Sequence, residues 1–281
     1  MFGYESWVLL NGIFIPASAA DTQVDRARID SSGIYGGSIT GANIPFGQVH
    51  YYDWPNVSAS LTTEATPTLI TTVKDMILQR QNPVSLILNS GQSGSQELQQ
   101  AWWNEISIST GEDALVTVNI NFTALERTRF DIDAFSAYWS NQTGGFANEF
   151  LPEYDPIPFW KTNISEFEYV KNWNLTISQE IIKFFGCMNY QANVPMNPCV
   201  LGCGILSGNL TFATHENDSN LITAMPLVFS GEDVNIRNTM TINIDGIGIT
   251  CKGELNLVDN PFSGTENLNE VGYNFQIYGV S

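Results

Sequence analysis

The residue types that most often carry out chemistry are scarce in this chain, and their spacing fits no catalytic or metal site. His50 and His215 are its two histidines, and neither has a cysteine or an acid at the spacing of a metal-ligand pair. Asp131 and Asp133, or Asp53 beside a tryptophan, could supply the two carboxylates that a glycosidase places across a sugar. Acids beside aromatic residues are expected in an acidic, aromatic-rich chain, so this pattern does not indicate a glycosidase.

Known catalytic motifs are missing as well. The sequence has no phosphate-binding glycine loop before a predicted helix, no Gly-x-Ser-x-Gly turn and no two-histidine zinc motif. Its four cysteines all lie in the second half: Cys187, Cys199, Cys203 and Cys251. Their even number permits disulfides and the Cys199–Cys203 spacing permits a metal, but a chain of this size needs neither for stability. We expect reduced thiols, no cofactor and no enzymatic activity.

The composition indicates a globular protein with a one-sided charge. The chain has 281 residues, enough for two domains of about 140 residues each. It has 29 acidic and 11 basic residues and a net charge of −18. This balance argues against binding nucleic acid through its phosphates, which needs clustered Lys and Arg, and against binding an anionic membrane surface. The excess acid serves either solubility or the repulsion of a polyanion, and charge alone leaves both readings open.

The N-terminal segment imitates a signal peptide but has the features of a hairpin. Glu5 stands where a signal peptide carries positive charge, and Asn11-Gly12 interrupts the apolar run. Asn-Gly between alternating apolar residues is the typical turn of a β-hairpin. We predict a hairpin over residues 5–15 that the mature protein retains, and we expect no membrane-spanning segment.

An alternating stretch occurs twice and sets the organisation of the chain. Residues 56–64 and 172–180 align without a gap, begin with Asn, end with Glu and carry apolar residues at alternate positions between. Such alternation predicts a strand with one buried face. Each copy is followed by apolar residues at helical spacing, over 69–78 and 181–188, and then by Asn-Pro and an apolar run. The sequence therefore predicts a duplication in which strand, short helix and strand recur.

The remaining segments complete a mainly β fold with short α-helices. A Gly-, Ser- and Ala-rich segment at about 17–48 is too long for an ordinary connection, so we predict an arm that docks on a neighbour or a loop over the core. Two tandem, related domains are predicted over 1–135 and 136–281, divided within an aromatic, Pro- and Gly-containing stretch, with an insertion at about 216–233 in the second. The other predicted elements are a helix over 95–104, a hairpin over 106–122, a sheet beginning at 48–53, and strands over 84–88, 199–201, 209–215, 239–256 and 271–278.

Two similar β domains in tandem present two similar sheet edges. An edge is a row of unpaired backbone donors and acceptors that proteins cover, charge or pair, and charges are few in these strands. Pairing with a neighbouring chain is therefore one solution. Contacts of this head-to-tail type close into rings when the rotation permits, and three duplicated chains would place six similar domains around an axis.

The opening residues, the Gly-rich stretch and the two related halves resemble tail tube proteins of long-tailed bacteriophages. The residues that carry this resemblance begin with Gly3-Tyr4-Glu5-Ser6-Trp7-Val8-Leu9-Leu10-Asn11-Gly12. The resemblance implies two β-sandwich or barrel domains with a flanking helix, and homotrimeric, pseudo-hexameric rings that stack into a tube. It also implies a lumen through which phage DNA passes without specific binding, and no catalytic residues. The insertion at 216–233 departs from strict equivalence of the halves.

Several expectations follow from this resemblance. The partners would be other copies of the chain and other tail proteins, and the protein would be assembled in the host cytoplasm and reside in the virion. An acidic lumen would let DNA slide, because DNA carries a negative charge about every 1.7 Å of its axis. The predicted subunit-interface residues lie at the centre of the Gly-rich segment: Ser32, Gly33, Ile34, Tyr35, Gly36 and Gly37. A capsid-decorating or fibre protein, and a secreted carbohydrate-binding β-sandwich, are the alternative functions.

Overall fold

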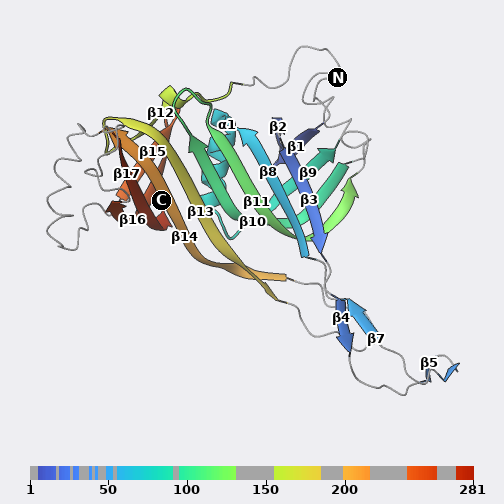
Figure 1. Ribbon diagram of the computed structural model, residues 1–281. Coiled ribbons are helices and arrows are strands. Elements are labelled where there is room, and N and C mark those ends of the chain that lie inside the picture. Colours follow the sequence, from blue (N-terminus) through green and yellow to red (C-terminus); the bar gives the residue numbers. More distant parts are fainter. Residues whose placement is uncertain are drawn as a thin grey trace, which may run out of the picture.

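One large antiparallel sheet organises the protein. The computed structural model describes residues 6–16, 19–25, 28–31, 38–39, 42–43, 49–52, 56–90, 95–130, 155–184, 199–215, 239–257 and 270–281. Thirteen strands form the sheet, with the order β12-β15-β16-β17-β14-β13-β10-β11-β8-β3, and with β2, β1 and β9 joined to β10. The sheet curls around the helix α1 (Figure 1). The prediction of a mainly β fold with short helical structure is therefore confirmed.

The elements of the first half precede residue 131. They are β1 (Ser6–Leu10), β2 (Ile13–Pro16), β3 (Ala19–Asp25), β4 (Arg28–Ser31), β5 (Ser38–Ile39), β6 (Ala42–Asn43), β7 (Val49–Tyr52), β8 (Asn56–Glu64), α1 (Pro67–Leu78), β9 (Val84–Ser90), β10 (Ser95–Thr110) and β11 (Thr117–Phe130). The second half contains a 3-10 turn (Phe159–Lys161), β12 (Thr162–Ile164), β13 (Val170–Phe184), β14 (Cys199–His215), β15 (Thr239–Ile244), β16 (Ile247–Leu257) and β17 (Glu270–Val280).

The second half repeats the strand order of the first. In the first half the neighbours run β3-β8-β11-β10, and β9 pairs with the N-terminal part of β10. In the second half they run β13-β14-β17-β16, and β15 pairs with the N-terminal part of β16. The halves meet where the C-terminal part of β10 pairs with β13. Each half thus contributes four strands to one continuous eight-strand path.

The registers of the two halves agree over the central stretch of the strands. When β3, β8, β11 and β10 are matched to β13, β14, β17 and β16, the cross-strand partners coincide from residue 19 to 24 of β3, from 117 to 122 of β11 and from 105 to 108 of β10, and they differ beyond the register shifts. Five matched positions carry the same residue: Ser58 and Ser207, Leu61 and Leu210, Thr62 and Thr211, Asn119 and Asn274, and Glu105 and Glu254.

This match corrects the alignment predicted from the sequence. Residues 56–64 form β8 as predicted, and 172–180 lie in β13, but the two strands do not hold equivalent places in the sheet. β8 corresponds to β14, and β13 corresponds to β3, since alternating strands resemble one another whatever their neighbours. The predicted strands over 114–122 and 271–278 do fall in equivalent strands, β11 and β17. The insertion at 216–233 lies outside the described residues, at the position in the chain that α1 holds in the first half.

Two predicted helices are wrong for a shared physical reason. Residues 95–104 belong to β10, and 181–184 belong to β13, while 185–188 lie outside the described residues. Both segments contain register shifts, and Gln100 has a φ of 49°. A β-bulge inserts a residue, so apolar side chains depart from strict alternation and take a spacing that imitates a helix.

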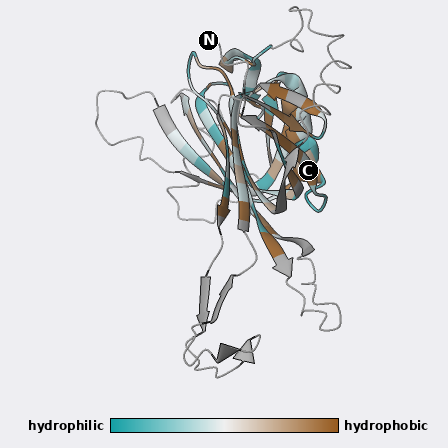
Figure 2. Cartoon of the chain, turned by 90° about the vertical axis from the view of Figure 1, so that its right-hand side faces the viewer, coloured by the Kyte–Doolittle hydropathy of each residue, from teal (hydrophilic) through white to brown (hydrophobic). Residues whose placement is uncertain are grey.

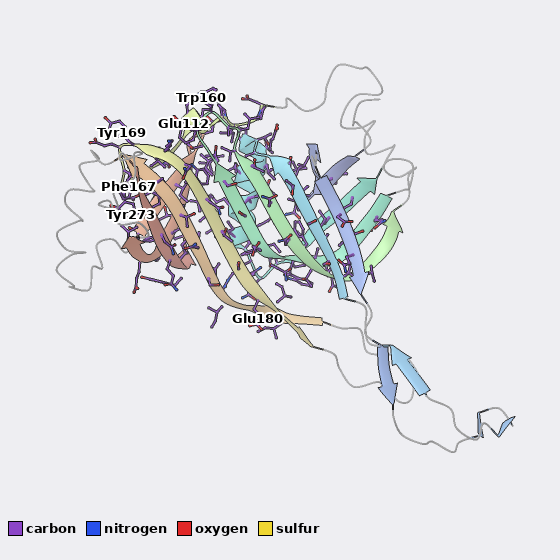
Figure 3. All side chains as sticks on the ribbon, viewed as in Figure 1. Glu112, Trp160, Phe167, Tyr169, Glu180 and Tyr273 are labelled. Atoms are coloured by element: carbon purple, nitrogen blue, oxygen red, sulfur yellow. The ribbon has the colours of Figure 1, made fainter. Side chains whose placement is uncertain are left out.

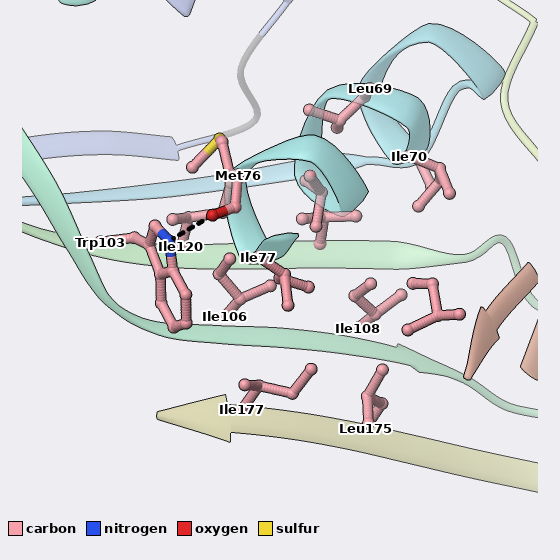
Figure 4. Close-up of a cluster of buried hydrophobic side chains, with 14 of the residues drawn as sticks. Leu69, Ile70, Met76, Ile77, Trp103, Ile106, Ile108, Ile120, Leu175 and Ile177 are labelled. Atoms are coloured by element: carbon pink, nitrogen blue, oxygen red, sulfur yellow. Dashed lines mark hydrogen bonds between the residues drawn. The ribbon is translucent and has the colours of Figure 1, made fainter. Parts of the chain in front are cut away.

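The helix α1 was predicted correctly and fills the space inside the curled sheet. The Thr66 side chain accepts a hydrogen bond from the Leu69 amide at 3.3 Å, and Pro67 follows at the first helical position, where no amide is needed. The buried residues of the helix are Leu69, Ile70, Thr72, Val73, Met76 and Ile77. They pack against Ile106 and Ile108 of β10 and against β13 (Figure 4).

The predicted hairpin over 5–15 is confirmed as β1 and β2. Asn11 and Gly12 have φ values of 51° and 78°, the backbone that a two-residue hairpin turn of this type requires. The Asn11 side chain accepts a hydrogen bond from the Ser85 amide at 3.0 Å, which fixes the hairpin to β9.

The Gly-rich segment was predicted as an arm or loop, but its first part belongs to the main sheet. β3 pairs with β8 from Ala19 to Asp25, so the sheet begins before residues 48–53. Residues 49–52 instead form β7, which pairs with β4 in a separate two-stranded sheet. The predicted division near residue 135 lies outside the described residues.

Candidate functional site: the polar face of the sheet

Three rows of paired strand positions cross one face of the eight-strand path. The alternation behind them is visible in Figure 2, where hydropathy changes from residue to residue along the strands. The central row crosses all eight strands at Glu254, Gln276, Asn209, Thr176, Ser107, Asn119, Thr62 and Ala19. A second row is Asn256, Asn274, Thr211, Asn174, Ser109, Thr117 and Glu64. A third is Ser207, Ser178, Glu105, Asn121, Ser60 and Asp21.

Hydrogen bonds between side chains link residues within and between the rows across neighbouring strands. Thr62 donates to the Asn119 oxygen at 2.7 Å, and Ser107 donates to the Asn174 oxygen at 3.1 Å. The second of these bonds crosses from β10 to β13, so the polar face continues over the junction between the halves. Cross-strand pairs of this kind stabilise a sheet and hold short side chains in place.

The rows are almost uncharged. Of the residues at these positions, four are acids and none is Lys or Arg; the acids are Asp21, Glu64, Glu105 and Glu254. Neighbouring rows lie about 6.6 to 6.8 Å apart, because successive residues on one face are two positions apart along a strand. These positions offer hydroxyl and amide groups to a polymer and hold no cation for a phosphate backbone, although Lys252 is exposed beside them, two residues before Glu254 on β16.

The opposite face is the core, and one buried polar side chain marks the junction of the halves. Ile106 and Ile108 face Ile177 and Leu175 across the β10–β13 pairing, and all four are buried. The next residue of β13 to point inward, Gln179, donates to the Trp103 carbonyl at 2.7 Å. It thus satisfies a backbone acceptor at the point where β13 leaves β10.

The two ends of the strands carry exposed apolar side chains. At one end Trp160 is 75% exposed, and it lies near Tyr169 and Glu112 (Figure 3). Tyr169 and Leu115 are exposed as well. At the other end, near Glu180, Ile205 is 85% exposed, and the preceding Gly204 carbonyl accepts a hydrogen bond from Arg80 at 3.0 Å. The sequence analysis did not identify these residues, because exposure of single apolar residues at strand ends leaves no periodic signal.

An aromatic cluster stabilises the end that carries Tyr169. Phe167 and Phe212 have ring centroids 4.8 Å apart, and Phe212 stacks on Tyr273 at 5.3 Å. The Thr214 hydroxyl donates to the Tyr169 carbonyl, which holds the loop before β13 in place. The cluster is buried, so its role is to fix the strand ends.

The described cysteine side chain is inert. Cys251 is a free, buried thiol, and burial, with a smaller contribution from the nearby Glu166 carboxylate, raises its pKa from 9.0 to about 12. Cys187 lies outside the described residues, and the side chains of Cys199 and Cys203 are not described. The described residues include no group of three or more His, Cys, Asp or Glu arranged to hold a metal ion.

Most of the sequence-predicted site residues fall outside the described part of the chain. The predicted subunit-interface residues do so, as a group between β4 and β5: Ser32, Gly33, Ile34, Tyr35, Gly36 and Gly37. Asp53, Asp131 and Asp133 also lie outside it. His50 belongs to β7, in the separate two-stranded sheet, and His215 ends β14 of the main sheet. Within the described ranges, no helix is long and apolar enough to cross a bilayer.

Comparison with solved structures finds a distant likeness. The chain is similar to a cryo-electron microscopy structure of the anti-feeding prophage baseplate, six-fold symmetrised, with 14% sequence identity and a TM-score of 0.31. The match covers 45% of this chain and 91% of the other. At that TM-score and identity the likeness does not establish a shared function. No protein-family model matches the sequence, and no curated protein matches it.

Proposed function

We propose that this protein is a structural subunit of a phage virion, and specifically the major tail tube protein, which forms stacked rings around a conduit for DNA. The observation that carries this proposal is the continuous eight-strand path with one buried face and one hydroxyl- and amide-lined face. A sheet of this kind can line a channel, because its inner wall needs no further layer of protein. The resemblance of the N-terminal residues to tail tube proteins agrees with this reading.

The repeated topology supports a ring of three chains. Each chain contributes two halves of the same strand order, already joined edge to edge along β10 and β13. If chains join as the halves do, three chains make a ring of six similar units with pseudo-sixfold symmetry.

The sparse acids on the polar face suit passage of a polyanion. In a ring, each of the three rows becomes a belt with a few carboxylates and many neutral groups. DNA would be weakly repelled along the rows and would meet few cations, of which Lys252 lies beside Glu254. The net charge of −18 acts in the same direction.

Electron microscopy of the purified protein and of native particles tests this proposal. We expect rings of three chains, stacked into tubes about an open channel, with antibody label along the tail. Label on the capsid or on fibres would assign the protein to another virion part. Specific binding on a glycan array by a protein that stays monomeric at high concentration would instead favour a carbohydrate-binding β-sandwich.

The lining is tested by reversing charge on the polar face. Replacing Glu105 and Glu254 with Lys adds two cations per chain to that face. The matched control replaces Glu112 and Glu168, exposed acids at the strand ends, and changes the net charge equally. We expect only the first variant to retain duplex DNA in the assembled tube at low salt and release it as salt rises. Equal behaviour of the two variants would contradict a channel lined by this face.

A further inference from the structure

We propose that the C-terminal part of β16, residues 253–257, pairs with β3 of a second copy of this chain, in the register that β10 and β13 use within the chain. This inference rests on the proposed function, because it takes the partner to be another copy in the same ring. It names the strands, the direction and the residue pairs of the contact.

The internal junction is the template. One side of β10 is shared by two strands: β9 pairs with its residues 95–101, and β13 pairs antiparallel with 105–110. The other side of β10 is occupied by β11. The second strand reaches β10 only beyond the bulge that follows Trp103.

β16 repeats this arrangement with one strand missing. β15 pairs with its residues 247–252, and β17 occupies its other side from residue 251 onward. Among the strands that the structure describes, none pairs with residues 253–257 on the β15 side. That stretch corresponds to the part of β10 that receives β13, so it is an edge shaped to receive a strand equivalent to β13.

β3 is that equivalent. It ends the sheet, with β8 as its partner, as β13 has β14. Its inward-facing Ala20 is exposed, whereas the matched Leu175 of β13 is fully buried against β10. The Thr22 amide donates to the Asp21 carboxylate at 2.7 Å, so a side chain serves a backbone donor at this edge. Docking on β16 would cover Ala20 and bring the backbone of β3 beside that of β16.

The match between the halves also sets the register. Glu105 pairs with Ser178, whose hydroxyl lies 3.5 Å from the Glu105 carboxylate. Glu254 corresponds to Glu105 and Gln23 corresponds to Ser178, so Gln23 would lie opposite Glu254 and donate to it. A shift of two residues would instead place Asp21 or Asp25 opposite Glu254, and like charges in that position are destabilising.

Disulfide trapping tests the strands and the register together. The variant Glu254→Cys with Gln23→Cys places both thiols at one predicted pair. Glu105→Cys with Ser178→Cys is the positive control, since those residues are paired within the chain. Glu254→Cys with Asp21→Cys is the register control, and each single cysteine variant measures background from the native thiols. All changes lie on the polar face, and urea unfolding of the reduced variants checks that they fold.

We expect mild oxidation of assembled Glu254→Cys/Gln23→Cys to give covalent trimers on non-reducing gels, at least tenfold faster than the Asp21 control. The Glu105→Cys/Ser178→Cys variant should close within one chain and stay monomeric. Failure of the Gln23 pair to cross-link above background, in protein that forms rings, would overturn this contact and leave the tube function standing. Covalent chains longer than three, without rings, would support the contact but overturn the ring and the tube.

Discussion

Gly253 begins the open stretch of β16, and its replacement by Ala gives a sharp test of the packing described above. A Cβ added at this position would lie 2.0 Å from the Gln276 carbonyl oxygen and 2.9 Å from the Phe275 ring. Cβ contacts under 3.0 Å essentially do not occur, and the nearer atom belongs to backbone. The β17 backbone would have to move by about 1 Å, in a sheet where β14 holds its other side. Such overpacking costs about 3 kcal/mol, the upper end of the usual range.

Gly279 provides the matched control, since it lies in the same pair of strands. A Cβ there would meet the Lys252 side chain at 3.7 Å, an ordinary contact. Gly279→Ala should therefore be neutral or slightly stabilising, because Gly weakens a strand by about 0.5 to 1 kcal/mol relative to Ala. In urea unfolding followed by tryptophan fluorescence, we expect a midpoint lower by about 1 M or more for Gly253→Ala alone. Equal midpoints for the two variants would refute the close approach of β16 and β17.

Three further outcomes follow from burial and charge. Trp103→Phe removes the indole donor that lies 3.0 Å from the buried Met76 carbonyl, and we expect a loss of about 2 to 3 kcal/mol in urea unfolding. Trp160 is 75% exposed, so Trp160→Ser should change the free energy of unfolding by less than about 0.5 kcal/mol. If this end of the strands contacts the next ring, the same variant should form shorter tubes in micrographs. Because burial raises the pKa of Cys251 to about 12, its thiol should resist alkylation in the native state at neutral pH. The stability that this raised pKa contributes should be complete below pH 9 and should be lost as pH rises towards 12. Cys251→Ala should remove this pH-dependent loss.

Local structure was predictable where turn and capping chemistry were strong. The Asn11-Gly12 turn, the helix α1 after Thr66, and strand β8 were all visible in the sequence, since each depends on residues close together in the chain. Strands β10 and β13 were misread where bulges break their alternation. A bulge is stabilised by its partner strand, so a single stretch of sequence does not reveal it.

A repeated strand pattern was visible in the sequence, but the strands that hold equivalent places in the sheet were not. β8 and β13 both alternate apolar residues with small polar ones, and this pattern matches any two half-buried strands. Only the order of neighbours separates them: β8 lies between β3 and β11, and β13 lies between β14 and β10. The identities that mark the true alignment, such as Asn119 with Asn274 and Glu105 with Glu254, are too scattered to be recognised without the registers.

The polar rows were half predictable. Alternation indicated that small hydroxyl and amide residues share one face of each strand, but not that strands from both halves align them into continuous rows. That alignment depends on the β10–β13 junction, which joins residues about 70 positions apart in the chain. The apolar ends of the strands were missed, since single exposed residues such as Trp160 carry no pattern.

A duplicated chain changes the physics of ring formation. Six separate units need six contacts between molecules, whereas three duplicated chains need three, because the β10–β13 contacts form as each chain folds. The contact left to form between chains is comparable to the internal one: the described open stretch of β16 comprises residues 253–257, and the internal contact spans residues 105–110 of β10. A short edge offers few backbone groups to strands of the wrong partner, which limits aggregation before assembly. Strength in the ring would then come from closure, in which each chain is held on both sides at once.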